Sequence, residues 1–250
     1  MIKYNCTAFV IKSSKYKEND RMLTLFSKEY GKISVIAKGG LSLKCKYFAS
    51  LQLFNLSEFE LSTTAEGKIP YISNAELLNS YDDFPLELVK YSSACYVAEL
   101  INSTYEQNVK ESVTFHLLKY TLNLFKKNTE EISIVILLCF ILKFLGIHGL
   151  NPNFKSCTEC GSETSNYFFN IDSGGIVCTK CIQFDKQNTI TALEAAYLDL
   201  LTYAIINEID FTQTNNALKS KKYLFTLLNS YIEYTLYKRI NSYQMLINII

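Results

Sequence analysis

The residues best suited to chemistry in this sequence are four cysteines in its second half. Cys157 and Cys160 form one Cys-x-x-Cys pair, and Cys178 and Cys181 form a second pair after seventeen intervening residues. Two residues between ligands allow both thiolates to turn toward one ion, and two such pairs complete a tetrahedron of sulfur atoms. The spacing therefore predicts one Zn²⁺ per chain, bound by all four cysteines.

The predicted zinc site is structural, because four thiolates leave no coordination position for a substrate or a reactive water. A cysteine-activated enzyme is disfavoured for the same reason. Three other interpretations stay open at this point: four free thiols, a redox-active pair, or iron in a rubredoxin-like site, since tetrahedral sulfur also suits iron. The aromatic residues Tyr167, Phe168 and Phe169 lie between the two pairs and are expected to cover the small site.

The rest of the sequence lacks the motifs of common catalytic sites. It contains no glycine-rich phosphate-binding loop, no dinucleotide-binding fingerprint and no serine nucleophile elbow. The two histidines, His116 and His148, have no motif partner. We interpret His148, near a predicted helix end, as a capping or core residue. The sequence therefore predicts a binding protein and no enzymatic activity.

Positive charge is concentrated in the first fifth of the chain. Residues 1–50 contain ten Lys and Arg against three Asp and Glu, although the whole chain has a net charge of +1. Lysines neutralise phosphates and aromatic rings stack on unpaired bases, so aromatic residues near lysines, such as Tyr16 and Phe48, are typical of a nucleic-acid-binding surface. The same residue types could instead fill a core and keep it soluble, which is our interpretation of Phe9 within its apolar run.

Short apolar clusters separated by turn residues predict the elements that carry this charge. Five or so strands follow one another between Tyr4 and about Leu78, with turns at 29–32, 39–40 and 65–68. A module of this size closes its strand edges most easily as a five-stranded barrel. We therefore predict a small, basic β-barrel over residues 1–79.

The periodicity becomes helical after residues 82–85, where Asp and Pro favour a helix start. Three helical segments follow and end near Gly149, and helix resumes at Thr191 and Glu194, which fit a capping box. The region between is rich in Cys, Gly, Ser and Thr. We expect a helical domain made of residues 80–152 and 189–250, interrupted by a Cys-rich insert at residues 153–188.

Composition limits the class of protein. The chain of 250 residues is 48% apolar and 20% charged, with nine Gly and three Pro, which excludes a mainly disordered or collagen-like chain. No secretory signal is visible at the N-terminus, and Lys143 and two glycines interrupt the most apolar stretch, residues 132–150. We expect a cytoplasmic protein with no membrane partner, whose remaining cysteines stay reduced.

Several segments resemble, in the same order, the bacterial DNA repair protein RecO (recombination protein O) family. The matching segments of the basic part are Ala8–Lys12, Tyr16–Arg21, Leu23–Phe26, Glu29–Lys32 and Val35–Gly39. The paired cysteines with Gly174 and Gly175 between them also fit, as does Leu218–Leu224. The resemblance covers essentially the whole chain.

This resemblance implies an α+β multidomain protein in which an N-terminal OB-fold β-barrel precedes an α-helical domain with a four-cysteine zinc-finger insert. It implies a mediator of DNA repair and homologous recombination that binds single- and double-stranded DNA and anneals complementary strands without ATP. Family members act with RecR, and with RecF where it is present, to help load RecA on single strands coated by SSB. They contact the acidic C-terminal tail of SSB and associate with the bacterial nucleoid during repair.

The resemblance also implies which residues bind DNA and metal. Arg21, Lys32 and Lys38 match family positions on or near the basic face of the barrel, and lysines of the same zone complete the predicted nucleic-acid site. The full predicted set is Lys12, Lys15, Arg21, Lys32, Lys38, Lys44 and Lys46. The four paired cysteines match the metal positions.

One segment departs from the family pattern. Where the family often has Ala and several arginines, residues 40–46 of this chain read Gly-Leu-Ser-Leu-Lys-Cys-Lys. Fewer charges there leave room for an alternative function. In that alternative, the chain is a zinc-ribbon protein-interaction adaptor with little intrinsic DNA binding, and its barrel serves only to dock proteins.

Overall fold

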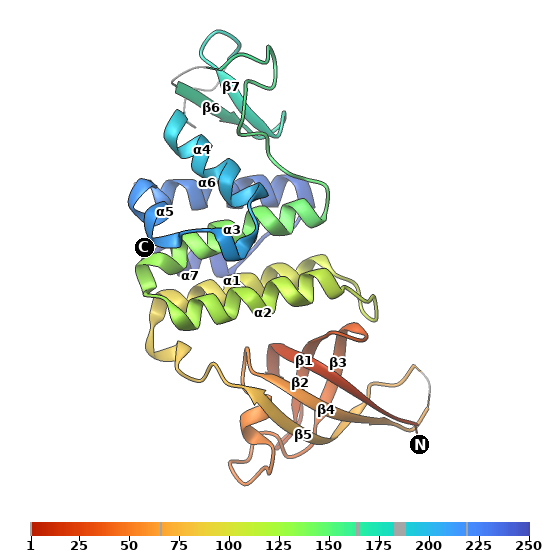
Figure 1. Ribbon diagram of the computed structural model, residues 1–250. Helices are drawn as coiled ribbons and strands as arrows, with labels where there is room; N and C mark the ends of the chain where they lie inside the picture. The colour runs from red at the N-terminus through yellow and green to blue at the C-terminus, as the bar shows by residue number, and fades with distance from the viewer. Residues whose placement is uncertain (1, 66, 164–165, 183–188, 219) are drawn as a thin grey trace. The chain divides into compact units, whose positions relative to one another are not determined.

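The computed structural model describes residues 2–65, 67–163, 166–182, 189–218 and 220–250. The chain divides into two compact units, residues 1–126 and 127–250 (Figure 1). The predicted insert includes residues 164–165 and 183–188, and the predicted helical domain includes residue 219. These positions lie outside the described residues.

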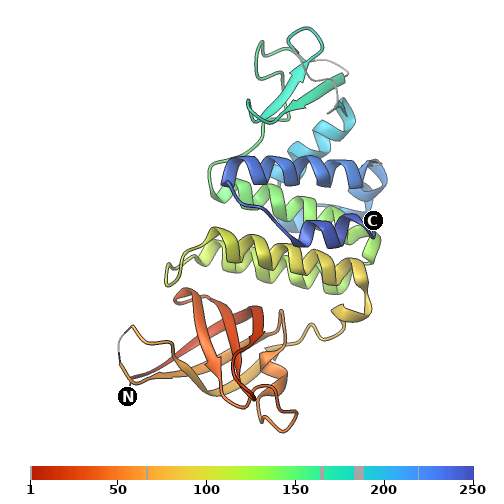
Figure 2. The same cartoon turned by 180° about the vertical axis from the view of Figure 1, so that it is seen from behind.

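Five strands of the first unit close into a barrel with the order β1-β2-β3-β5-β4 (Figures 1 and 2). The β3–β5 pair is parallel, and the other neighbouring strands are antiparallel. This is the arrangement of an OB-fold, so the predicted five-stranded barrel is confirmed. The strands are β1 (Ile2–Lys15), β2 (Arg21–Ser27), β3 (Gly31–Ala37), β4 (Leu56–Thr63) and β5 (Tyr71–Asn79).

Alternation along the strands separates the two faces of the barrel wall. Ala8 and Val10 of β1 belong to the apolar cluster that fills the barrel. Phe9, between them, is also fully buried, but its ring packs against Phe115 of a helix at 5.3 Å between ring centres. Phe9 is therefore a core residue, as predicted, and it belongs to the layer between the barrel and the helices of the same unit.

Two helices complete the first unit: α1 (Leu88–Thr104) and α2 (Ser112–Lys127). The short helices η1 (Phe48–Leu51) and η2 (Phe84–Leu86) precede them. Pro85 lies in η2, and the extended backbone at Glu87 separates η2 from α1. The first long helix therefore begins several residues later than residues 82–85, where the sequence predicted it.

The loop between α1 and α2 is fixed to the β2–β3 turn by a close backbone approach. The amide of Asn108 donates to the Lys32 carbonyl at 2.8 Å. Gly31 has a φ of +67°, and a Cβ atom there would lie 1.7 Å from the Val109 carbonyl oxygen. Only glycine fits this position, because any side chain would overlap the backbone of the loop.

The second unit is built around α3 (Glu130–Ile147), which contacts three other helices of the unit. Residues 133–142 of α3 are all buried, which explains why this stretch is the most apolar of the chain. Among the described residues, no helix combines the length and apolar character needed to cross a membrane. The other helices are α4 (Ala192–Tyr203), η3 (Ile206–Glu208), α5 (Phe211–Ala217), α6 (Lys221–Leu236) and α7 (Ser242–Ile247).

Helix ends in this unit follow the sequence signals. Thr191 and Glu194 form the predicted capping box of α4, with each side chain bonded to the backbone amide of the other residue. His148 is the C-cap residue of α3, and its Nδ1 lies 2.8 Å from the Phe144 carbonyl oxygen. His148 is thus a capping residue, as predicted.

The Cys-rich insert forms a three-stranded sheet with the order β7-β6-β8. The strands of this sheet are β6 (Asn166–Asn170), β7 (Gly175–Cys178) and β8 (Thr189–Thr191), and β8 lies just past the predicted insert boundary at residue 188. Gly174, with a φ of +63°, lies in the turn between β6 and β7, where the predicted reversal is found. Strand β8 continues directly into α4, which attaches the insert to the helical part of the unit.

Candidate metal centre and nucleic-acid interface

The four paired cysteines come together at one point of the insert. Their Sγ atoms all lie within 4.8 Å of one another, and those of Cys160 and Cys178 are 3.7 Å apart. Four sulfur atoms placed about 2.3 Å from one ion form a tetrahedron with edges of about 3.8 Å. The observed arrangement therefore has the size that a tetrahedral metal ion requires.

Two tight turns and the end of a strand position the thiols. The Gly161 amide donates to the Cys157 carbonyl at 2.9 Å, and the Cys181 amide donates to the Cys178 carbonyl at 3.1 Å, so each pair bends around its own turn. The Cys178 amide donates to Cys157 Sγ at 3.3 Å, which joins the two pairs.

A hydroxyl group favours the thiolate form of one of the four cysteines. Ser162 Oγ lies 3.1 Å from Cys160 Sγ. This hydrogen bond is the largest cause that lowers the pKa of Cys160 below its ordinary value. Four cysteines so arranged can hold a metal ion without any further ligand.

Phe169 of the insert has a different role from the one expected. Among the described residues, Val177 and the partly buried Ile182 are apolar residues that pack with the cysteines. Phe169 stacks on Phe154 at 5.7 Å and meets Tyr231 of α6 at 5.6 Å between ring centres. The expectation that Phe169 covers the metal site is therefore wrong, because its ring anchors the insert to the helices.

The isolated cysteines differ chemically from the four of the cluster. Burial raises the pKa of Cys6 and of Cys139 to about 12, and that of Cys95 to about 11. These thiols stay protonated at neutral pH and are poor ligands and nucleophiles. Cys139 is fully buried in α3.

The strand register gathers three of the predicted DNA-binding residues at one end of the barrel. Lys15, the last residue of β1, pairs with Arg21, the first residue of β2. Arg21 pairs in turn with Ala37, the last residue of β3, and Lys38 follows directly. Lys15 and Lys38 are exposed and Arg21 is half-buried.

The loop after β3 extends this basic end. The Asp20 carboxylate accepts a hydrogen bond from the Gly39 amide at 2.8 Å, and the Leu41 amide donates to the Asn19 carbonyl at 3.1 Å. These bonds join the β1–β2 turn to the loop that carries Lys44 and Lys46, both exposed. We call Lys15, Arg21, Lys38, Lys44 and Lys46 the basic rim.

Cations of the basic rim lie against aromatic rings. Lys38 Nζ is 4.1 Å from the centre of the Tyr71 ring, and the Arg21 guanidinium carbon is 5.2 Å from that of Phe48. Lys46 lies 5.9 Å from the Tyr47 ring. Tyr71 comes from β5 and was not in the predicted site, because its sequence distance from the basic segment gives no signal of this contact.

Two predicted residues lie away from the basic rim. Lys12 is exposed in β1 opposite Thr24, about 10 Å along the strand from Lys15. Lys32 is buried, and its Nζ donates to the Asn102 carbonyl oxygen in the last turn of α1 at 2.6 Å. Lys32 therefore supports the helix C-terminus, and we leave it out of the proposed nucleic-acid site because its side chain is buried against α1.

Comparison with known proteins gives a consistent result over nearly all of the chain. Residues 1–81 match the family described as "Recombination protein O N terminal", and residues 85–244 match "Recombination protein O C terminal". A relative from Alkaliphilus metalliredigens named "DNA repair protein RecO" is 35% identical over 196 residues, which cover 76% of this chain and 78% of the relative. A relative of the same name from Desulforamulus reducens is 30% identical over 247 residues, which cover 96% and 92% of the two chains.

Proposed function

The chain belongs to the recombination protein O family of DNA repair proteins, and we propose that it binds DNA through the basic rim and anneals complementary strands without ATP. The observation that carries this proposal is the placement of Lys38 over Tyr71 and Arg21 over Phe48 at one end of an OB-fold barrel. Cations neutralise phosphates and the neighbouring rings stack on unpaired bases, which is how such barrels bind single strands.

The chemistry of annealing follows from charge. Two complementary strands repel one another, and a protein surface that neutralises phosphates on both lowers this repulsion. The sequence contains no phosphate-binding loop motif, so the proposed activity draws on binding energy alone. Lys12, Lys15, Arg21, Lys38, Lys44 and Lys46 form the proposed nucleic-acid site for single- and double-stranded DNA.

The proposal includes the partners of the family. With RecR, and with RecF where it is present, the protein helps to load RecA on single strands coated by SSB, and it contacts the acidic C-terminal tail of SSB. These steps take place in the bacterial cytoplasm, at the nucleoid. The boundaries proposed for the parts are those given above: a barrel over residues 1–79, a helical domain over 80–152 and 189–250, and a zinc-finger insert over 153–188.

We propose Zn²⁺ as the metal of the four-cysteine cluster, with one ion per chain. Thiolate ligands, a tetrahedral arrangement and four protein ligands are typical of structural zinc. The ion would fix the turns that hold the cysteines and would take no part in DNA chemistry.

An annealing assay tests the proposed function. Two complementary oligonucleotides with a fluorophore and a quencher are mixed without ATP, and the rate of quenching is measured with and without protein. We expect the protein to accelerate annealing and the combined Lys38→Ala, Lys44→Ala and Lys46→Ala variant to lose most of the acceleration. No acceleration by the wild-type protein, with no DNA binding at low salt, would favour the protein-interaction adaptor.

A further inference from the structure

A cavity of about 780 Å³ opens in the wall of the barrel, within the first unit. Tyr4 of β1, Ile33 and Ser34 of β3, and Ile69 between β4 and β5 line it, together with Gln107 and Asn108 of the α1–α2 loop. Its volume falls in the range of roughly 300–1,000 Å³ that is typical of small-ligand sites. None of these residues belongs to the basic rim.

The strand topology explains why the cavity exists. Strand β3 pairs with β5 at Ile36 and Tyr71, and it bridges to the α1–α2 loop at Lys32 and Gln107. The edge of β3 between these two attachments, at Ile33 and Ser34, faces the cavity. The opening is therefore a product of how the barrel closes.

The walls combine apolar surface with amide and hydroxyl groups. Tyr4 is half-buried and Ile69 is exposed, and their side chains offer surfaces against which a planar ring can pack. On the other side, Gln107 Nε2 donates to Ser34 Oγ at 3.3 Å, a long bond that a better partner can replace. Amide side chains present a donor and an acceptor side by side, which is the pattern that pairs with the edge of a nucleobase.

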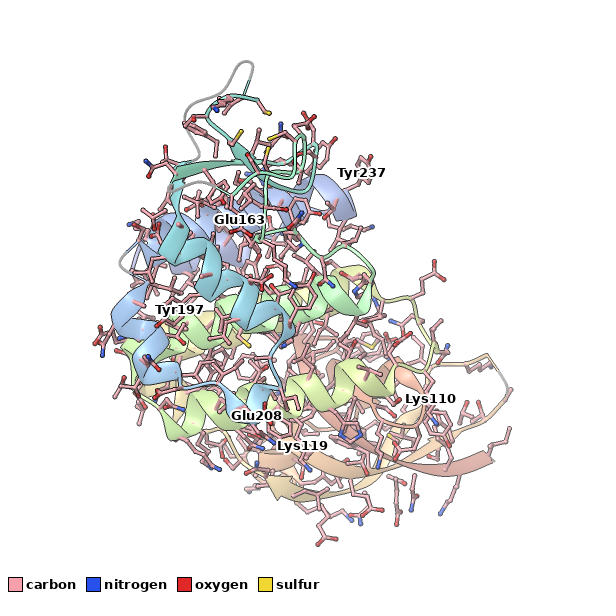
Figure 3. The ribbon with its side chains drawn as sticks, turned by 45° about the horizontal axis from the view of Figure 1, so that its top comes forward. Lys110, Lys119, Glu163, Tyr197, Glu208 and Tyr237 are labelled. Carbon is pink, nitrogen blue, oxygen red and sulfur yellow. The ribbon has the colours of Figure 1, made fainter. Side chains whose placement is uncertain are left out.

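Two exposed lysines border the cavity. Lys68 is part of the lining, and Lys110 lies two residues beyond the lining residue Asn108. Figure 3 shows Lys110 on the loop that leads into α2. Glu106, on the same loop, is an exposed acidic neighbour. The ammonium group of Lys68 favours a ligand that carries phosphates.

Backbone neighbours connect the lining of the cavity to the basic rim. Ile69 and Pro70 line the cavity, and the next residue, Tyr71, carries Lys38 over its ring. The Ile36 amide donates to the Pro70 carbonyl at 2.9 Å, which holds this segment against β3. A single strand of DNA bound at the basic rim can therefore reach the cavity without crossing another element of the barrel.

We propose that this cavity binds one unpaired nucleobase of the single strand whose phosphates lie on the basic rim. The inference rests on the proposed DNA binding and adds a contact with a nucleobase to the contacts with phosphates. A base inside a duplex is stacked and paired and cannot enter, so the cavity favours single strands over double strands.

Binding of two oligonucleotides of equal length and charge tests the proposal. One is a run of about twelve thymidines, within the site size of an OB-fold, and the other carries abasic residues throughout. The wild-type protein should bind the thymidine strand roughly tenfold more tightly or better, because each stacked base adds substantially to affinity. Ser34→Phe, which fills the cavity, should lower this ratio severalfold and leave binding of the abasic strand unchanged.

Two further variants keep the test decisive. Ser73→Phe places the same ring on a half-buried position of β5 outside the cavity lining and should keep the wild-type ratio. If Ser34→Phe fails to fold, Gln107→Leu takes its place: it removes one amide from the exposed loop without adding charge, and it should also lower the ratio. The proposal would be overturned if the cavity variants kept the wild-type ratio of affinities for the two oligonucleotides. It would also be overturned if they lost affinity equally for the thymidine strand and the abasic strand. Failure of the wild-type protein to bind either strand would instead refute the proposed function.

Discussion

Lys38 Nζ lies 4.1 Å from the centre of the Tyr71 ring, so the end of β3 and the start of β5 present a cation and an aromatic face together. This contact predicts separate roles for the two side chains in DNA binding. Tyr71→Leu should weaken binding of a single-stranded oligonucleotide about fivefold or more, because a stacked base contributes about 1–3 kcal/mol. The salt dependence of binding should not change, since the ring carries no charge.

The control for this variant is Tyr120→Leu, which removes an exposed ring of α2 in the same unit. Fluorescence anisotropy at several salt concentrations measures both variants. Equal affinity of Tyr71→Leu and the wild-type protein would show that the ring does not contact bases.

Lys32 is expected to matter for stability and not for DNA. Lys32→Met removes the hydrogen bond to the Asn102 carbonyl and leaves that oxygen without this partner. Loss of a hydrogen bond from a charged donor costs about 1–3 kcal/mol of unfolding free energy. Urea unfolding should show this loss, whereas the exposed neighbour Lys28→Met should change little. A variant that folds normally but binds DNA less tightly would return Lys32 to the nucleic-acid site.

The metal centre predicts that a cysteine of the cluster is needed to retain the metal and that a cysteine outside it is not. Cys178→Ser should release the metal and destabilise the insert, because metal binding and local folding are coupled. Cys45→Ser, outside the cluster, should retain one metal per chain. Elemental analysis of the purified proteins gives both the identity and the amount of metal. Iron in place of zinc, or full metal content in Cys178→Ser, would contradict the structural zinc site.

Buried thiols predict how stability depends on pH. Burial raises the pKa of Cys139 from 9.0 to about 12, so the thiol stays protonated in the folded protein while the unfolded chain ionises above pH 9. The stability that depends on this thiol is present below pH 9 and is lost as the pH rises from 9 toward 12. Urea unfolding at pH 8 and at pH 10 measures this effect. The unfolding free energy of Cys139→Ala should fall by about 1 kcal/mol less between these pH values than that of the wild-type protein. Equal losses in the two proteins would show that Cys139 is accessible to solvent.

Local signals made much of this architecture predictable. The Thr191 and Glu194 capping box depends on residues three positions apart, and the spacing within each cysteine pair is equally local. The alternating clusters predicted five strands, and closure of the strand edges predicted a barrel. In each case the cause lies within a few residues of its effect.

Contacts between distant segments explain what the sequence did not reveal. Lys32 has the same charge as its neighbours in the chain, and its burial depends on the Asn102 carbonyl, seventy residues away. Tyr71 joins the basic rim only because β5 pairs with β3. Phe169 is one of three adjacent aromatic residues, and its direction is set by Phe154 and Tyr231. Residue type and spacing carry no information about such partners.

The most direct test of DNA binding by the basic rim is the salt dependence of binding to a labelled single strand. With about six phosphate contacts, a plot of log K against log salt concentration should have a slope near −4. The combined Lys38→Ala, Lys44→Ala and Lys46→Ala variant should reduce the magnitude of this slope by about 2. A control variant that neutralises the exposed Lys180, Lys238 and Arg239 should keep the wild-type slope. The same slope in the wild-type protein and the rim variant would contradict the proposed interface.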